Sequence, residues 1–233
     1  MVLGIYGAGG LGREAYILAS QINVQQKRWE EFIFIVDNPV FNECNGIRVH
    51  SFSEVIEKYK SQDLEICIAI GEPQIRAFLR QRIIDSGFSL ATLIHPNIYV
   101  PEDTIISKGS IISENCFISC GSCIGENVYL QPGAMVGHDS QVGSDSVISS
   151  LVMIGGKCRV GNRTYIGPVV PVKDQVNIGD DSIIALGSAV IRDIPNNVIA
   201  LGNPARPMKN NDDKKVFKNY GGINKNDESG KIQ

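Results

Sequence analysis

The sequence predicts a small α/β domain with a parallel sheet, followed by a β-solenoid. Aliphatic residues recur at every sixth position from Val100 to Val190 without a break in register. A period of six fits neither an amphipathic helix nor a lone strand, but it fits a solenoid of short strands and tight corners. Before this repeat, a glycine-rich turn separates an apolar strand from a helix-like segment, and two more apolar strands follow. That order is typical of an α/β unit.

In the α/β part, the first 90 residues alternate between strand and helix patterns. We expect strands at 2–6, 32–36 and 65–70, with helices at 13–22 and 73–87. A last apolar segment, SLATLIHP, leads into the repeat. This is half of a doubly wound dinucleotide domain, because a full one needs two such units.

The glycine-rich turn satisfies the pattern G-x-G-x-x-G at Gly7, Gly9 and Gly12, after a strand and before a helix. Such a turn brings backbone N–H groups and a helix N-terminus to a phosphate. Asp37, at the end of the next strand, stands where an acidic residue commonly contacts a ribose or base. A single half-unit favours a mononucleotide with its diphosphate, such as a nucleotide-linked sugar. An NAD-dependent dehydrogenase and a turn without a ligand are the alternatives.

In the solenoid, each six-residue unit is expected to supply one strand and one corner. Three units make a triangular coil of about 18 residues, and about five coils are expected. The small or β-branched residue four positions after each aliphatic anchor, such as Ser110 or Ala134, should point inward, because three chain segments converge on a narrow axis. Gly often follows the anchor directly, as at Gly137, and we expect it to let the corner adopt a positive φ. The unbroken register argues against a β-sandwich.

Composition narrows the function classes. The chain has 233 residues and a net charge of −3, which argues against a basic nucleic-acid surface. No apolar run approaches the roughly 18 residues of a membrane span and no leader is evident, so we expect a cytoplasmic protein without a membrane partner. Cys120 and Cys123 form a C-x-x-C, but no second pair or histidine set follows at zinc spacing, so no metal is expected. Residues 210–233 are polar and are expected to form a flexible tail.

Of the three histidines, only His138 lies within the repeat, at a corner and next to Asp139. An exposed imidazole with a carboxylate in contact is a plausible general base near neutral pH. With about 18 residues per coil, Cys120 should lie beneath His138 and Gly156 above it, about 4.8 Å away in each case. The pair Gly155-Gly156 should then leave a gap for a slender chain, with a backbone N–H there for an oxyanion. Cys120 as a nucleophile is the alternative to direct attack.

Six segments occur in a fixed order: GAGGLGRE, VDN, IAIGEPQIR, IHP, VGHDSQVG and GNPAR. Together they resemble the bacterial hexapeptide-repeat sugar acetyltransferases, in which a small Rossmann-like domain precedes a left-handed β-helix. The resemblance spans about residues 1–209. It implies a Rossmann-like nucleotide-sugar-binding domain at 1–90 and a left-handed β-helix acetyltransferase domain at 91–209, before the polar tail at 210–233.

The resemblance also implies site residues and partners. His138 matches the family's catalytic base and Asp139 the acidic residue beside it. A homotrimer is implied, with acetyl-CoA held between neighbouring β-helices and a nucleotide-linked amino sugar in the small domain. Positions that match nucleotide-sugar contacts are Gly9, Gly10, Leu11, Asp37, Asn38 and Gly71. Positions that match the CoA site are Gly156, Gly167, Pro168, Leu186, Gly187 and Arg206.

The expected reaction is transfer of an acetyl group from acetyl-CoA to the amine of a nucleotide-linked amino sugar, by direct attack with His138 as base. One departure from the family is Val147, where many members have a second histidine near the acetyl donor. O-acetylation of a sialic-acid-type sugar and a non-catalytic nucleotide-sugar-binding protein are the alternatives. The residues do not distinguish the sugar or its nucleotide carrier.

Overall fold

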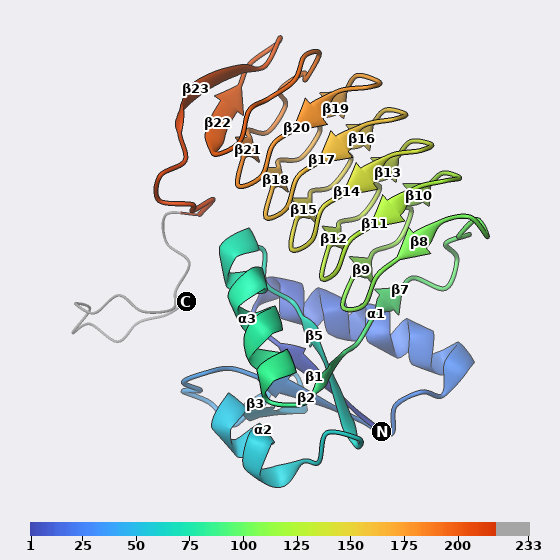
Figure 1. Ribbon diagram of the computed structural model, residues 1–233. Helices are drawn as coiled ribbons and strands as arrows, with labels where there is room; N and C mark the ends of the chain where they lie inside the picture. The colour runs from blue at the N-terminus through green and yellow to red at the C-terminus, as the bar shows by residue number, and fades with distance from the viewer. Residues whose placement is uncertain (218–233) are drawn as a thin grey trace.

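The computed structural model describes residues 1–217. Figure 1 shows an α/β domain beneath a stack of parallel coils, with α1 and α3 nearest the coils and α2 at the far end. Among the helices of residues 1–217, none combines the length and the apolar character needed to cross a membrane.

The α/β domain contains a six-stranded sheet in the order β3-β4-β2-β1-β5-β6. All neighbouring pairs are parallel except β3 with β4. β1 lies inside the sheet and β5 is wholly buried, which explains their uninterrupted apolar sequences. The strands are β1 (Val2–Tyr6), β2 (Glu31–Ile35), β3 (Glu43–Cys44), β4 (Ile47–His50), β5 (Leu64–Ile68) and β6 (Ser89–Leu90), and the helices are α1 (Gly10–Gln26), α2 (Phe52–Lys58) and α3 (Pro73–Asp85).

The hairpin of β3 and β4 and the helix α2 were not predicted from the sequence. A sequence signal for α2 exists, because Ser51 and Glu54 form a reciprocal capping box at its N-terminus. The short apolar run Ile47–His50 forms β4 in the interior of the sheet.

The solenoid is a triangular prism whose successive coils give short strands, two residues long from β7 to β21, to three sheets that are parallel apart from β23. The four-stranded sheet contains β10 (Phe117–Ile118), β13 (Met135–Val136), β16 (Met153–Ile154) and β19 (Pro171–Val172). The five-stranded sheet contains β8 (Ile105–Ile106), β11 (Cys123–Ile124), β14 (Gln141–Val142), β17 (Arg159–Val160) and β20 (Asn177–Ile178). The eight-stranded sheet contains β7 (Leu93–Ile94), β9 (Ile111–Ile112), β12 (Tyr129–Leu130), β15 (Val147–Ile148), β18 (Tyr165–Ile166), β21 (Ile183–Ile184), β22 (Val198–Leu201) and, antiparallel, β23 (Arg206–Asn210).

The core of the prism confirms the six-residue pattern. The anchors from Ile112 to Val190 are almost fully buried, and so are the small residues between them. The small hydroxyl residues also join the coils. Ser140 Oγ donates to Gly155 O at 2.9 Å and accepts from Cys158 N at 3.0 Å. The inward position therefore suits serine because its hydroxyl satisfies backbone groups that face the axis.

The expected reason for glycine after the anchor is wrong. Left-handed backbone occurs three residues after the anchor, mostly at non-glycine residues such as Asp139 (φ 58°) and Val169 (φ 58°). The glycine directly after the anchor is needed because the next coil lies against it. A Cβ added at Gly137 would lie 2.6 Å from the carbonyl carbon of Gly155, and one added at Gly143 would lie 2.5 Å from that of Gly161.

The α/β domain packs on the eight-stranded sheet. Outward side chains of this sheet, Tyr129 and Val147 among them, share one apolar cluster with α1 and β1. Beside it, α3 follows the corner between the five-stranded and eight-stranded sheets. Buried Arg76 donates to the carbonyl and the side chain of Asn127, and Arg80 forms a two-bond ion pair with Asp145. Polar and apolar contacts together fix the two parts against each other.

The predicted flexible tail is wrong for its first part. Asn210 ends β23, and buried Asn211 donates to Asp181 O at 2.8 Å. The segment 211–217 then reaches α3, where the carboxylate of Glu72 accepts the backbone N–H groups of Val216 and Phe217 at 3.0–3.1 Å. The remainder of that prediction, residues 218–233, lies outside the described residues.

Candidate active site

His138 lies at the corner between β13 and β14, where the four-stranded and five-stranded sheets meet. Its Nδ1 is 2.9 Å from Asp139 Oδ2, and both side chains are more than half exposed, at 54% and 57%. The left-handed backbone of Asp139 turns its carboxylate back toward the imidazole. With Nδ1–H donated to the carboxylate, Nε2 keeps its lone pair and is available to take a proton.

The stacking expectation for this corner is confirmed. Asp139 N donates to Cys120 O at 3.0 Å, and Lys157 N donates to His138 O at 2.7 Å. Exposed Cys120 therefore lies one coil below His138 and Gly156 one coil above it. The Cys120 thiol accepts a long hydrogen bond from Ser119 Oγ at 3.9 Å.

Two finer expectations for the corner are wrong. The space beside Gly156 is not an open gap, because the imidazole fills it: an added Cβ would lie 2.5 Å from His138 Nε2. The backbone N–H groups there also have partners. Gly155 N donates to Val172 O at 2.9 Å, and Gly156 N donates to Asp174 Oδ1 at 2.8 Å. They are not free to receive an oxyanion in this conformation.

The predicted nucleotide-sugar residues meet at the carboxyl edge of the six-stranded sheet. β1, β2 and β5 are parallel neighbours, so Gly9, Asp37 and Gly71, which follow them, lie at one edge. A Cβ at Gly12 would lie 2.0 Å from Gly7 O, so this glycine allows α1 to start directly against the turn. The other predicted residues of this edge are Gly10, Leu11 and Asn38.

The helix α1 begins without a side-chain cap. Its N-cap, Gly9, offers no side-chain acceptor, and neither Gly9 nor Gly10 has a neighbouring atom within 4 Å of an added Cβ. The start of α1 thus has no side chain at Gly9 or Gly10, which leaves room for a phosphate beside the first turn.

Asp37 has partners that the sequence did not reveal. Its Oδ1 accepts from Tyr6 Oη at 2.6 Å and from Arg82 Nη1 at 2.6 Å. Burial, reinforced by the hydrogen bond to Asp37, raises the pKa of Tyr6. Arg82 comes from α3, 45 residues along the chain, so no local pattern could have assigned it to this edge.

Five of the six predicted CoA residues lie at two corners of the prism. Gly156 is at the His138 corner, whereas Gly167, Pro168, Leu186 and Gly187 are at the corner between the eight-stranded and four-stranded sheets. That second corner is apolar and open: Leu186 is 75% exposed, and Leu151 and Val169 are exposed beside it. Arg206 is exposed at the start of β23.

Val147 lies elsewhere. Its side chain is fully buried in the cluster between the eight-stranded sheet and the α/β domain. Within one chain it faces α1 and not the His138 corner, so here an aliphatic side chain helps the two parts pack.

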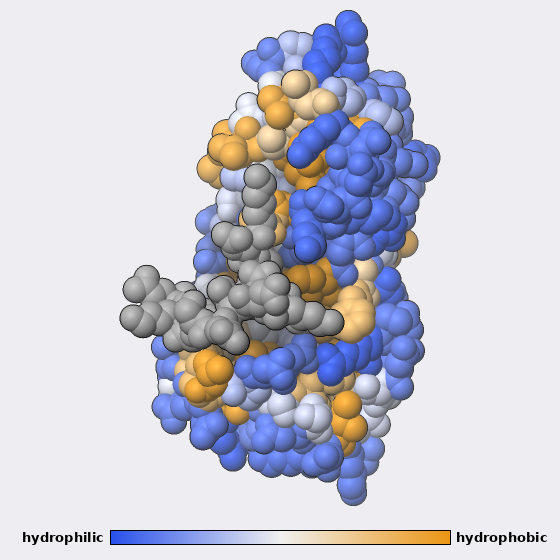
Figure 2. Space-filling model, turned by 90° about the vertical axis from the view of Figure 1, so that its left-hand side faces the viewer, coloured by the Kyte–Doolittle hydropathy of each residue, from blue (hydrophilic) through white to orange (hydrophobic). Residues whose placement is uncertain are grey.

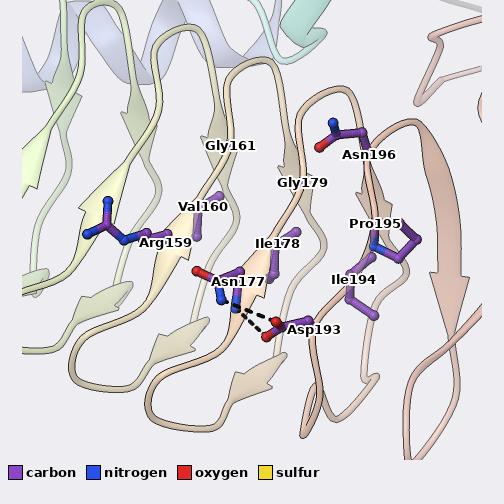
Figure 3. A pocket seen from close by; sticks show the side chains of 10 residues that line it. All are labelled: Arg159, Val160, Gly161, Asn177, Ile178, Gly179, Asp193, Ile194, Pro195 and Asn196. Carbon is purple, nitrogen blue, oxygen red and sulfur yellow. Dashed lines mark hydrogen bonds between the residues drawn. The ribbon is translucent and has the colours of Figure 1, made fainter.

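A hollow of about 430 Å³ lies on the five-stranded sheet at the last coils (Figure 3). Asn177 and Asp193 pair across it through two hydrogen bonds of 2.8 and 3.2 Å. None of the predicted site residues lines it. Residues 1–217 also contain no group of three or more His, Cys, Asp or Glu side chains placed to hold a metal ion.

Comparisons with known proteins agree with this architecture. Residues 2–83 match the PglD N-terminal domain, and residues 124–156 match the bacterial transferase hexapeptide repeats. The GDP-perosamine N-acetyltransferase of Escherichia coli O157:H7 is 30% identical over 88% of this chain and 96% of its own length.

Solved structures extend the likeness to the whole fold. The acetyltransferase domain of PglB from Neisseria gonorrhoeae FA1090 is 27% identical, with a TM-score of 0.83 over 89% of this chain and 99% of its own. PerB from Caulobacter crescentus, solved with CoA and GDP-perosamine, is 26% identical, with a TM-score of 0.79 over 90% and 98%. The predicted left-handed β-helix and Rossmann-like domain are thus confirmed. The chain belongs to the sugar N-acetyltransferases that join a PglD-type N-terminal domain to a hexapeptide-repeat β-helix.

Proposed function

We propose that the protein transfers an acetyl group from acetyl-CoA to the amine of a nucleotide-linked amino sugar, with His138 as general base. The observation that carries this is the exposed His138–Asp139 pair, joined at 2.9 Å on a solenoid corner. The similarity over most of the chain to a GDP-perosamine N-acetyltransferase supports the acceptor class.

In the proposed step, the sugar nitrogen attacks the thioester carbonyl carbon while its proton passes to His138 Nε2. The carbon–sulfur bond then breaks, the acetyl group stays on nitrogen, and CoA leaves as the thiol after its sulfur takes the proton from His138 Nε2, which returns the base to its neutral form. Asp139 stabilises the imidazolium that forms in between. The uncapped start of α1 would hold the diphosphate of the acceptor.

We propose a homotrimer because one chain cannot complete this site. The α/β domain covers the eight-stranded sheet, whereas His138 is on the edge of the prism opposite that sheet. The acceptor edge and the base are therefore separated by the prism of their own chain. A neighbouring copy that places its own surfaces at the His138 edge would complete the site that one chain leaves divided.

Exposed apolar side chains support such an assembly. On the outer side of the four-stranded sheet, Phe117, Met135 and Met153 are 40–53% exposed. Figure 2 shows another face, on the side of β22 and β23, where hydrophobic patches also lie between hydrophilic areas. Clusters of this kind mark interaction surfaces. With all six cysteines free, we propose a reducing compartment, the cytoplasm.

The test is thiol release from acetyl-CoA with a panel of nucleotide-linked amino sugars and free sialic acids. His138→Ala should lower kcat about 10²–10⁴-fold and leave the affinity for the nucleotide sugar unchanged, whereas His95→Ala, a histidine outside the corner, should retain activity. Turnover only with sialic acids would show that these, and not nucleotide-linked amino sugars, are the acceptors. Ligand binding without thiol release would indicate a binding protein. An acetyl adduct on Cys120, with loss of turnover in Cys120→Ala, would contradict direct attack.

A further inference from the structure

Gly156 is unusual among the corners of the solenoid. The residue two positions after each anchor carries a side chain at every other unit from Lys108 to Leu186, with glycine at position 156 alone. The same position one coil below is His138. Glycine thus occurs where the coil above meets the imidazole.

The fit between them is close. A Cβ added at Gly156 would lie 2.5 Å from His138 Nε2 and 2.9 Å from both Cδ2 and Cε1. All three ring atoms lie within 2.9 Å of the place of the missing side chain, so the imidazole lies over the Gly156 Cα. The backbone of Gly156 does not adopt the left-handed conformation, so alanine would be excluded there by the ring and not by backbone strain.

The Gly156 backbone is also held in place. Its N–H donates to Asp174 Oδ1 at 2.8 Å, and its carbonyl accepts from Gln175 N at 2.9 Å. Lys157 N, the next amide, donates to His138 O at 2.7 Å. The chain cannot retreat from an added methyl group without losing bonds to both neighbouring coils, so the imidazole would have to move.

A second glycine borders the carboxylate. A Cβ at Gly121, one coil below, would lie 2.7 Å from Asp139 Oδ1. The ring and the carboxylate of the His138–Asp139 pair therefore each occupy space left by a glycine in an adjacent coil.

We propose that Gly156 is a positioning residue whose missing side chain forms the slot that holds the His138 imidazole, with Nδ1 on Asp139 and Nε2 facing the substrate. This rests on the proposed role of His138 as the base. A methyl group in the slot rotates the ring away, breaks the Nδ1 bond and displaces Nε2.

The test is Gly156→Ala, alone and combined with His138→Ala. In the wild-type background, kcat should fall about 10²-fold, since a displacement of about 1 Å has an effect of that order, while the KM of each substrate changes less than about twofold. With the ring removed in His138→Ala, the added methyl has room, so the second substitution should lower the residual rate far less than it lowers the wild-type rate.

Two readouts do not depend on the acceptor. Gly156→Ala should lower the Tm of the wild type by a few degrees and should not lower that of His138→Ala. Nitrogen-15 NMR should find the proton of the neutral His138 ring on Nδ1 in the wild type and distributed over both nitrogens in Gly156→Ala. Equal Tm losses in both backgrounds, or an unchanged tautomer, would overturn the proposal that Gly156 forms a slot for the His138 ring. Absence of acetyl transfer by the wild type would overturn only the proposed function.

Discussion

At the residue scale, His138 and Asp139 differ in what their loss should do. The imidazole would take the proton, whereas the carboxylate, 2.9 Å from Nδ1, fixes the tautomer and stabilises the charged ring. Asp139→Asn keeps the shape but presents an amide, so we expect kcat to fall about 10–100-fold, less than for His138→Ala.

Steady-state kinetics with both substrates would measure this, and Asp103→Asn, an exposed carboxylate in the first coil, is the matched control. A loss as large as that of His138→Ala would mean that the carboxylate itself takes part in proton transfer.

The sequence predicted which residues lie one coil below and above His138, but not the geometry around its ring. A fixed period of six places Cys120 and Gly156 in the same stack as His138, because register alone decides which residues lie one coil apart. Whether Gly156 leaves an open gap depends on the rotamer of a side chain in another coil. Its N–H likewise bonds to Asp174, and a choice of hydrogen-bond partner is not encoded in the period.

At the element scale, the segment 211–217 joins the last coils to the start of α3. Lys214 Nζ pairs with Asp181 at 3.1 Å, and Phe217 contacts the ring of Tyr165. Glu72 is 3% exposed, and both of its carboxylate oxygens accept hydrogen bonds from this segment. Burial raises the pKa of Glu72 even though the backbone hydrogen bonds from Phe217 and Val216 oppose the rise.

We therefore expect Glu72→Ala to release the end of this segment. The amides of Val216 and Phe217 lose their acceptor, so their hydrogen exchange should become at least about 10-fold faster, while that of the buried strand β5 stays slow. Glu57→Ala, an exposed carboxylate on α2, is the control. Unchanged exchange at both amides would show that Tyr165 and Asp181 hold the segment without Glu72.

The prediction of a flexible tail was wrong for this segment because it rested on polar composition alone. Residues 211–217 have few apolar side chains, and a chain of that composition does not form a core of its own. Here its partners come from other elements, because Glu72 is the N-cap of α3 and Asp181 lies at a solenoid corner. Such long-range hydrogen bonds leave no local trace, whereas the solenoid coils are set by a repeat that can be read directly.

At the scale of the whole molecule, the proposed site needs two surfaces that one chain keeps apart. His138 is on the edge between the four-stranded and five-stranded sheets, and Leu186 is on the edge between the eight-stranded and four-stranded sheets. In a three-fold assembly packed through the four-stranded side, the first edge of one copy adjoins the second edge of the next.

Two inactive variants should then complement each other. His138→Ala lacks the base, and Leu186→Glu places a charge on the exposed apolar corner proposed for the donor. When the two chains are unfolded together and co-assembled in equal amounts, about a quarter of the interfaces should pair an intact His138 with an intact Leu186, and activity should return to about that fraction of the wild type. Each variant refolded alone should stay inactive, and light scattering should report a trimer in every sample. A trimeric mixture that stays as inactive as its components would place His138 and the donor corner of a single chain in the same site. Light scattering that reports a monomer would rule out a site shared between chains.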